Sequence, residues 1–97
     1  SSYVAAQVAV ANAEKMPVYT FGSQELTVAR QRLEASRLAS LDGEAELAEM
    51  LAIEAQVSAD LAVAKTTLGK TSAMNQQMQD QSNAIRQEMQ RNKKVTP

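Results

Sequence analysis

The 97-residue sequence contains no cysteine, no histidine and no tryptophan. Without cysteine the chain can form no disulfide and offers no thiolate for catalysis or metal binding. Without histidine it also lacks the usual general base and the commonest zinc ligand. We therefore expect no catalytic residue, no cofactor and no bound metal. The lack of cysteine does not by itself identify the redox compartment.

A strong charge of either sign is also missing, because ten basic and eleven acidic residues give a formal net charge of −1. A nucleic-acid-binding chain is usually clearly basic, so we expect no nucleic-acid partner. No apolar run approaches the ~20 residues of a membrane-spanning helix, so we expect no transmembrane span. The sequence opens with Ser1-Ser2 instead of methionine. This opening suits the mature start of a bacterial lipoprotein, whose targeting segment would lie upstream, and it suits a trimmed chain equally.

What the chain does contain is alanine. Hydrophobic residues make up 44% of the sequence, but only three residues are aromatic. Alanine has the highest helix propensity and a small side chain, so we predict helices that approach closely, not a thick core of large side chains. A chain of this length fits one small domain, close to the size at which a single core is only marginally stabilising.

The first predicted helix covers residues 3–16 and carries a stripe at helical spacing, Val4, Val8 and Ala11. Pro17 ends it, because proline disfavours helical geometry in the residue before it. The connector that follows, MPVYTFG, is predicted to be extended and ordered. We expect three of its side chains to fill the end of the bundle: Val18, Tyr19 and Phe21.

The second predicted helix covers residues 24–41, with Ser23 as its expected N-cap. The short Asp42-Gly43 link forces an antiparallel hairpin with the third helix, for which Asp42 is the expected N-cap. Small and apolar residues lie on two sides of the second helix, so we expect a neighbour on each side. One stripe is Leu26, Ala29, Leu33, Ser36 and Ser40, and the other is Val28, Ala35 and Leu38.

The third predicted helix, residues 44–92, carries a heptad pattern that we call the seam. Its positions recur at alternating intervals of three and four residues, which is the signature of a coiled coil. Nine of the thirteen seam positions are apolar. The positions are Leu47, Met50, Glu54, Val57, Leu61, Ala64, Leu68, Thr71, Asn75, Met78, Ser82, Ile85 and Met89.

The third helix is predicted to extend beyond its neighbours. Its length would be ~73 Å at ~1.5 Å per residue, against ~27 Å for the second helix. We therefore expect the first two helices to cover the seam only as far as about Thr67. An unpartnered helix is marginal in water, so the remainder is expected to self-associate, to dock on another protein or to fray. The predicted organisation is a three-helix bundle over residues 1–69 and a helical extension with a frayed C-terminus over residues 70–97.

The candidate interaction residues lie on the seam of this extension: Leu68, Asn75, Met78, Ile85 and Met89. Asn75 is interpreted as tolerated polarity, or alternatively as a residue that sets the register of an oligomer. The methionines, together with Met74, are interpreted as gap-filling core residues, or alternatively as an adaptable partner surface.

Charge is distributed unevenly along the third helix. Residues 42–60 contain six acids and no base, whereas bases cluster near the C-terminus at Arg86, Arg91, Lys93 and Lys94. Both ends complement the helix dipole, and the simplest interpretation is solvated charge. The alternative is a basic tip that contacts anionic lipid headgroups or an anionic polymer.

A wider pattern covers residues 19–66. A tyrosine-containing connector leads to a Glu-Leu helix start, an A-x-x-x-L-x-x-A helix, an Asp-Gly turn and an alanine-rich third helix. These places are taken by Tyr19, Glu25, Leu26, Ala29, Leu33, Ser36, Asp42, Gly43, Leu51, Ala52, Ala55, Asp60 and Ala62. The pattern resembles the family catalogued as domain of unknown function 4398, and with the first helix the likeness covers about residues 3–70. The chain departs from it at Ser36, which replaces an alanine, and at Ser23-Gln24, where many members have proline.

This resemblance implies an envelope setting and no catalytic residues. Members look like Gram-negative envelope proteins, often lipoproteins, and are sometimes placed ahead of an OmpA-type peptidoglycan-binding domain. We therefore expect a periplasmic protein near peptidoglycan or the outer membrane, with a lipid anchor on an upstream segment as one route of attachment.

The predicted fold class is all-α, an antiparallel three-helix bundle whose long third helix extends as a coiled-coil-like tail. The leading functional prediction is a non-catalytic scaffolding module of the bacterial cell envelope, which pairs with itself or with another envelope protein through that tail. The alternative is a periplasmic carrier or chaperone-like adaptor that binds an apolar segment between helices. An enzyme is disfavoured, because acids such as Glu44 and Glu46 lie in one helical turn and not opposite each other in a pocket.

Overall fold

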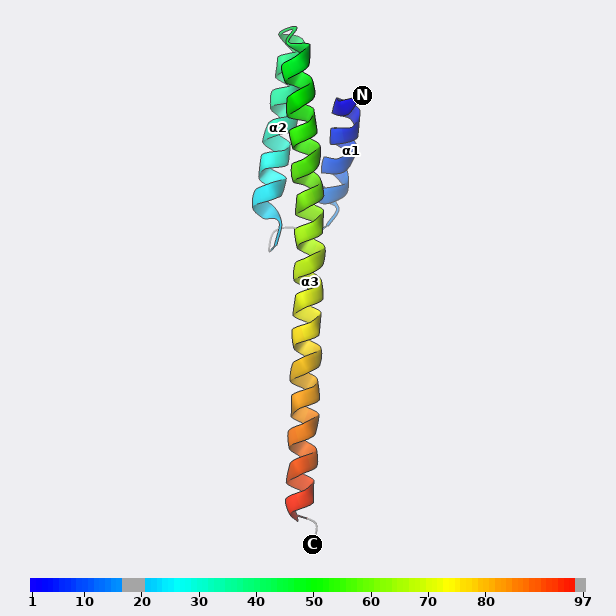
Figure 1. The fold of residues 1–97 in the computed structure, drawn as a ribbon, viewed down its shortest axis with the longest axis vertical. Coiled ribbons are helices and arrows are strands. Elements are labelled where there is room, and N and C mark those ends of the chain that lie inside the picture. The colour runs from blue at the N-terminus through cyan, green and yellow to red at the C-terminus, as the bar shows by residue number, and fades with distance from the viewer. Residues whose placement is uncertain (17–20, 96–97) are drawn as a thin grey trace. The chain divides into compact units, whose positions relative to one another are not determined.

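The computed structural model describes residues 1–16 and 21–95, with side chains described as far as residue 93. This part of the chain forms three α-helices, α1 (Ser2–Glu14), α2 (Ser23–Leu41) and α3 (Ala45–Val95) (Figure 1). The described ranges contain no strand, and the predicted all-α class is confirmed. Two compact units are present, Ser1–Thr67 and Leu68–Pro97, which we call the bundle unit and the tail unit. The boundary drawn from the sequence falls after residue 69.

Helix α2 runs antiparallel to both of its neighbours in the bundle unit. Ser36, late in α2, donates a hydrogen bond of 2.6 Å to the Ala48 carbonyl, early in α3. Arg30 of α2 donates a hydrogen bond of 3.0 Å to Glu14, at the end of α1. Ser2, the first residue of α1, donates to Glu49 of α3 at 2.9 Å. The order is therefore down, up and down, as the predicted antiparallel bundle requires.

The core of the bundle unit is built mainly from alanine. Nine of the eleven buried apolar residues in the described part are alanines, and one cluster joins α1, α2 and α3 through residues such as Ala13, Ala29 and Ala59. The two valines of the stripe identified in the first helix, Val4 and Val8, do not belong to this core and are 54% and 55% exposed. Because alanine methyl groups line the contact faces, the helix axes can approach closely.

The second stripe predicted on α2 is also largely exposed. Val28 and Leu38 are 38% and 49% exposed, so they are not covered by a neighbouring helix. The buried positions of α2 are Leu26, Ala29, Ser36 and Ala39. Helix α2 still contacts both other helices, but it does so through one face that lies between them.

The link between α2 and α3 is a Schellman motif. Gly43 has a positive φ of 79°, and the N–H of Glu44 donates to the Ala39 carbonyl at 2.9 Å. The N–H of Gly43 donates to Ser40 at 3.1 Å, which completes the motif. Asp42 is therefore the C-cap of α2, and its expected role as N-cap of α3 is wrong. Helix α2 ends at Leu41, as predicted, and α3 begins at Ala45, one residue after its predicted start.

The start of α2 is determined by Gly22, which is its N-cap in place of the expected Ser23. A Cβ atom at Gly22 would lie 2.5 Å from the Ala62 carbonyl oxygen and 3.0 Å from the Thr66 hydroxyl oxygen. The backbone of Gly22 therefore packs directly on α3. Phe21 beside it is 39% exposed and does not fill the end of the bundle. The other two side chains expected there, Val18 and Tyr19, lie outside the described residues.

Candidate interaction surfaces

Helix α3 has two different faces within the bundle unit. The side toward α1 and α2 is a row of small residues, Ala52, Ala55, Ala59, Ala62 and Thr66, all at most 1% exposed. About half a helical turn away, on the other side, lie the large apolar residues. We call this second surface the outer face, and it consists of Leu47, Met50, Ile53, Val57 and Leu61, which are 39–60% exposed.

The outer face corrects the expectation that α1 and α2 cover the seam as far as Thr67. Four of its members, Leu47, Met50, Val57 and Leu61, are seam positions, and all four are exposed. The two neighbouring helices pack on the alanine row instead, because that row permits closer contact between backbones. The sequence does carry this signal, since alanines recur at alternating intervals of four and three residues from Ala48 to Ala62.

A groove runs beside the outer face, between α2 and α3. It has a volume of about 360 Å³ and is lined by Val28, Arg32, Ile53, Glu54, Val57 and Ser58. The ion pair between Arg32 and Glu54, at 3.1 Å, lies within this groove and joins the two helices. Val28 therefore adds an apolar side chain from α2 to the outer face of α3.

The tail unit presents a second apolar surface. Every side chain described from Lys70 to Lys93 is exposed, including Asn75. The large apolar residues repeat at heptad-related spacing and are 59–68% exposed. We call them the tail face: Leu68, Met74, Met78, Ile85 and Met89. The seam residues predicted for interaction are thus accessible in this unit.

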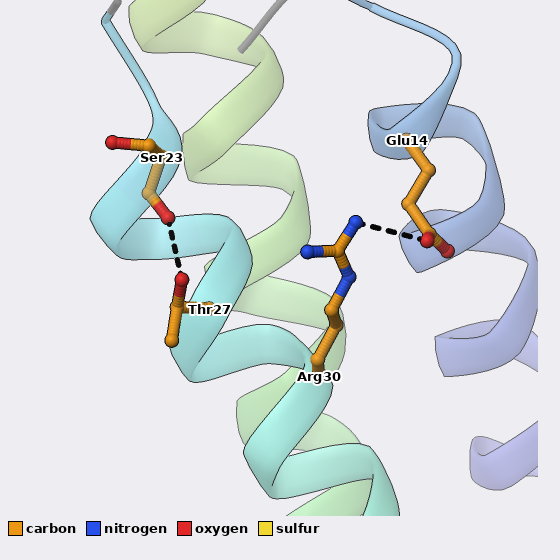
Figure 2. A network of polar contacts seen from close by, with 4 residues as sticks. All are labelled: Glu14, Ser23, Thr27 and Arg30. Atoms are coloured by element: carbon orange, nitrogen blue, oxygen red, sulfur yellow. Dashed lines mark hydrogen bonds and ion pairs between the residues drawn. The ribbon is translucent and has the colours of Figure 1, made fainter. Parts of the chain in front are cut away.

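Ion pairs in the bundle unit use four of its five basic residues. Figure 2 shows one of them, in which Arg30 of α2 points toward Glu14 of α1 at 3.0 Å, near the Thr27–Ser23 hydrogen bond. The four pairs are Arg30–Glu14, Arg32–Glu54, Arg37–Glu34 and Lys65–Glu25. The acids left over form no ion pair with a described residue, and they are Asp42, Glu44, Glu46, Glu49 and Asp60.

The tail unit, in contrast, contains more bases than acids. Glu88 pairs with Arg91, and Asp80 accepts a hydrogen bond from Gln76 at 3.0 Å. Three bases form no ion pair within the described residues, namely Lys70, Arg86 and Lys93. The predicted basic tip is therefore reduced at Arg91 by its pairing, and the side chain of Lys94 lies outside the described residues.

Formal charges of the two units have opposite signs. Residues 1–67 contain nine acids and five bases, which gives −4. Residues 68–97 contain two acids and five bases, which gives +3, and the two values add to the −1 of the whole chain.

Two carboxyls in the bundle unit have pKa values lowered by their ion pairs. The Lys65 ammonium donates a hydrogen bond to Glu25, and this bond, together with a backbone hydrogen bond at Glu25, lowers the pKa of the carboxyl. The pKa of Glu34 is lowered in the same way by its hydrogen bonds from Arg37. Both shifts favour the charged forms of surface ion pairs that link or brace helices, which is a structural role.

A second hollow, of about 340 Å³, lies where α1 begins, between α2 and α3. Its lining includes Ala45, Ala48 and Ala52 of α3, Ser40 of α2 and Tyr3 of α1. This hollow, lined partly by alanines, is where the adaptor hypothesis would place an apolar segment.

In residues 1–16 and 21–95, no group of three or more acidic, histidine or cysteine side chains is placed to hold a metal ion. Within the same ranges, no helix combines the length and apolarity needed to cross a membrane.

Comparison with known proteins identifies one family. The family model for Domain of unknown function (DUF4398) matches residues 1–78. This range takes in the whole bundle unit and the first eleven residues of the tail unit. No curated protein and no solved structure matches the chain.

Proposed function

This chain belongs to the DUF4398 family, and we propose that it is a non-catalytic scaffolding module of the bacterial cell envelope that self-associates through its tail unit. The envelope and periplasmic setting is supported by the family resemblance described above. The mode of action is supported by the exposed tail face of the chain itself.

The observation that carries the proposal is the exposure of the tail face. Leu68, Met74, Met78, Ile85 and Met89 each leave about three-fifths or more of their surface in water. Burial of a large apolar side chain contributes about 1.5–3 kcal/mol, so a row of five provides a driving force for association. A helix of this kind is also marginal alone, because most helical stability comes from packing.

Polar seam positions set the expected strength of the association. Thr71, Asn75 and Ser82 interrupt the apolar row of the tail unit. Polar residues at such positions reduce stability but select particular alignments of the partner helices. A reversible, concentration-dependent association is therefore expected, which suits a scaffold that assembles where its local concentration is high.

The first prediction tests this use of the tail face. The double substitution Met78→Lys/Ile85→Lys should shift the solution mass toward the monomer value of 10.5 kDa, because it places two charges on the apolar row. Sedimentation equilibrium over a range of concentrations measures the effect. The matched control is Ala73→Lys/Gln87→Lys, which adds the same charge on the far side of the same helix. Its solution mass should equal that of the wild-type chain.

Two results would contradict the proposal. One is a wild-type chain that sediments as a monomer at every concentration up to the millimolar range. The other is an equal loss of association in the seam and control variants, which would point to net charge instead of the tail face.

The adaptor function is the second candidate, and the hollow beside Tyr3 and Ala48 favours it. An adaptor would remain monomeric and would bind an apolar peptide in that hollow. The sedimentation experiment therefore separates the two functions, since only the scaffold requires association of the chain with itself.

A further inference from the structure

We propose that the tail unit of one copy packs on the outer face of the bundle unit in a second copy. The inference rests on the proposed self-association and identifies the surface that receives the tail. This chain would then be its own partner through two different surfaces, an acidic one and a basic one.

The apolar parts of the two surfaces are alike in size. The outer face offers Leu47, Met50, Ile53, Val57 and Leu61, and the groove beside it adds Val28. The tail face also offers five large apolar residues, all on a single helix. A helix that lays such a row into an apolar groove is a common mode of helix recognition.

The unpaired charges of the two surfaces are complementary. Glu46 and Asp60 flank the outer face in the heptad register, and neither forms an ion pair with a described residue. Arg86 and Lys93 flank the tail face, and within the described residues they are also unpaired. Glu46 and Asp60 are fourteen residues apart and Arg86 and Lys93 are seven apart, so contact in a given register would place one acid opposite one base. The complementary signs favour this pairing and steer the encounter.

Pairing of two tail units with each other is less favourable on the same grounds. Each tail unit has a formal charge of +3, so a tail-to-tail contact would place like charges side by side. Contact of a tail unit with a bundle unit joins +3 to −4 instead. If two copies exchange tails reciprocally, the contact closes as a dimer, and if they do not, it continues into longer assemblies.

A charge-swap experiment on the full chain tests this inference. One variant, Glu46→Lys/Asp60→Lys, reverses the charges beside the outer face, and a second, Arg86→Glu/Lys93→Glu, reverses those beside the tail face. Each variant alone would present like charges at the contact, so its self-association should weaken by at least about tenfold. An equimolar mixture should recover association, because each variant then meets a complementary surface on the other.

Sedimentation equilibrium of each variant and of the mixture measures these effects, with isothermal titration of one variant into the other as a second readout. All four residues are exposed, and recovery in the mixture also shows that both variants remain folded. A wild-type chain that associates, together with a Glu46→Lys/Asp60→Lys variant that associates equally well, would overturn the inference and leave tail-to-tail self-association standing. A wild-type chain that stays monomeric would overturn both the inference and the proposed function.

Discussion

At the scale of single residues, the bundle unit depends on positions where a small group is required. Gly22 packs its backbone against the Ala62 carbonyl, and the fully buried Thr66 directs its hydroxyl back to that same carbonyl at 2.8 Å. Position 22 therefore has no space for a side chain. Its φ of −133° is open to any residue, so the requirement comes from packing against α3 and not from backbone conformation.

Gly22→Ala should destabilise the bundle unit by about 1–3 kcal/mol, because the new methyl group would overlap a backbone atom that cannot move without shifting α3. Urea denaturation followed by circular dichroism measures the change. Ser23→Ala, one residue further on and exposed, is the control and should alter stability by no more than about 0.5 kcal/mol. Equal midpoints for the two variants would contradict the close approach seen at Gly22.

The ion pair of Glu25 with Lys65 gives a pH-dependent prediction. The pKa of Glu25 is lowered in the folded chain, so the folded state binds fewer protons than the unfolded state around that pKa. The stabilisation from the pair should be fully present above the unfolded pKa of about 4.3 and should be lost as the pH falls through the lowered folded value.

Urea denaturation of wild-type chain and Glu25→Gln at pH 7 and at pH 2 tests this pH dependence. The wild-type chain should be the more stable at pH 7, and the difference should shrink toward pH 2, because the stabilisation is lost as the pH falls through the lowered pKa of the carboxyl. A difference of the same size at both pH values would indicate that Glu25 acts through packing and not through its charge.

At the scale of elements, α3 is the feature that departs most from a usual amphipathic helix. Its alanine row is buried and its large apolar residues are exposed within the same unit. In most helices the largest apolar side chains face the core. The reversal follows from the close contact of α1 and α2 with the alanine row, and it leaves the outer face free for another helix.

Substitutions on the two faces of α3 should therefore differ in cost, with the larger loss of stability on the alanine row. Ala59→Leu should destabilise the bundle unit by about 1–3 kcal/mol or more, because it inserts a large side chain where the residue is fully buried against α1 and α2. Leu61→Ala, on the outer face, should change the unfolding free energy of the monomer by no more than about 1 kcal/mol, because the leucine is 46% exposed.

Chemical denaturation at a concentration below the association range compares these two variants. The expected order is the reverse of that for an ordinary core, where removing a leucine costs about 2–5 kcal/mol. A larger loss from Leu61→Ala than from Ala59→Leu would show that the outer face, and not the alanine row, is the buried side of α3.

At the scale of the whole molecule, the two units differ in net charge but both expose large apolar side chains. The bundle unit is acidic and the tail unit is basic, and each exposes a row of large apolar residues. Because the charges are opposite, the charge-swap variants test whether the bundle unit of one copy recognises the tail unit of a second copy. The DUF4398 match ends at residue 78, so the basic end of the tail unit, with Arg86 and Lys93, lies beyond the matched range.

Much of the fold was predictable from local signals in the sequence. The first helix was predicted to end shortly before Pro17, and α1 ends at Glu14. Asp42-Gly43 joins the next two helices, and the alanine-rich composition specifies helices that pack closely. The exposed seam of the tail unit was predictable as well, because the third helix is longer than the two shorter helices can cover. The helix ends and the turn depend on interactions within a few residues of the chain, and helix length follows from where those ends lie.

Tertiary structure alone decided which side of α3 is buried. A 3.6-residue period fits both the alanine row through Ala55 and the seam through Val57, and periodicity does not rank two rows of similar regularity. The choice depends on how near α1 and α2 can approach, which is a property of three helices together. The requirement for glycine at position 22 has the same origin, since it arises from a contact with Ala62 forty residues away in the sequence.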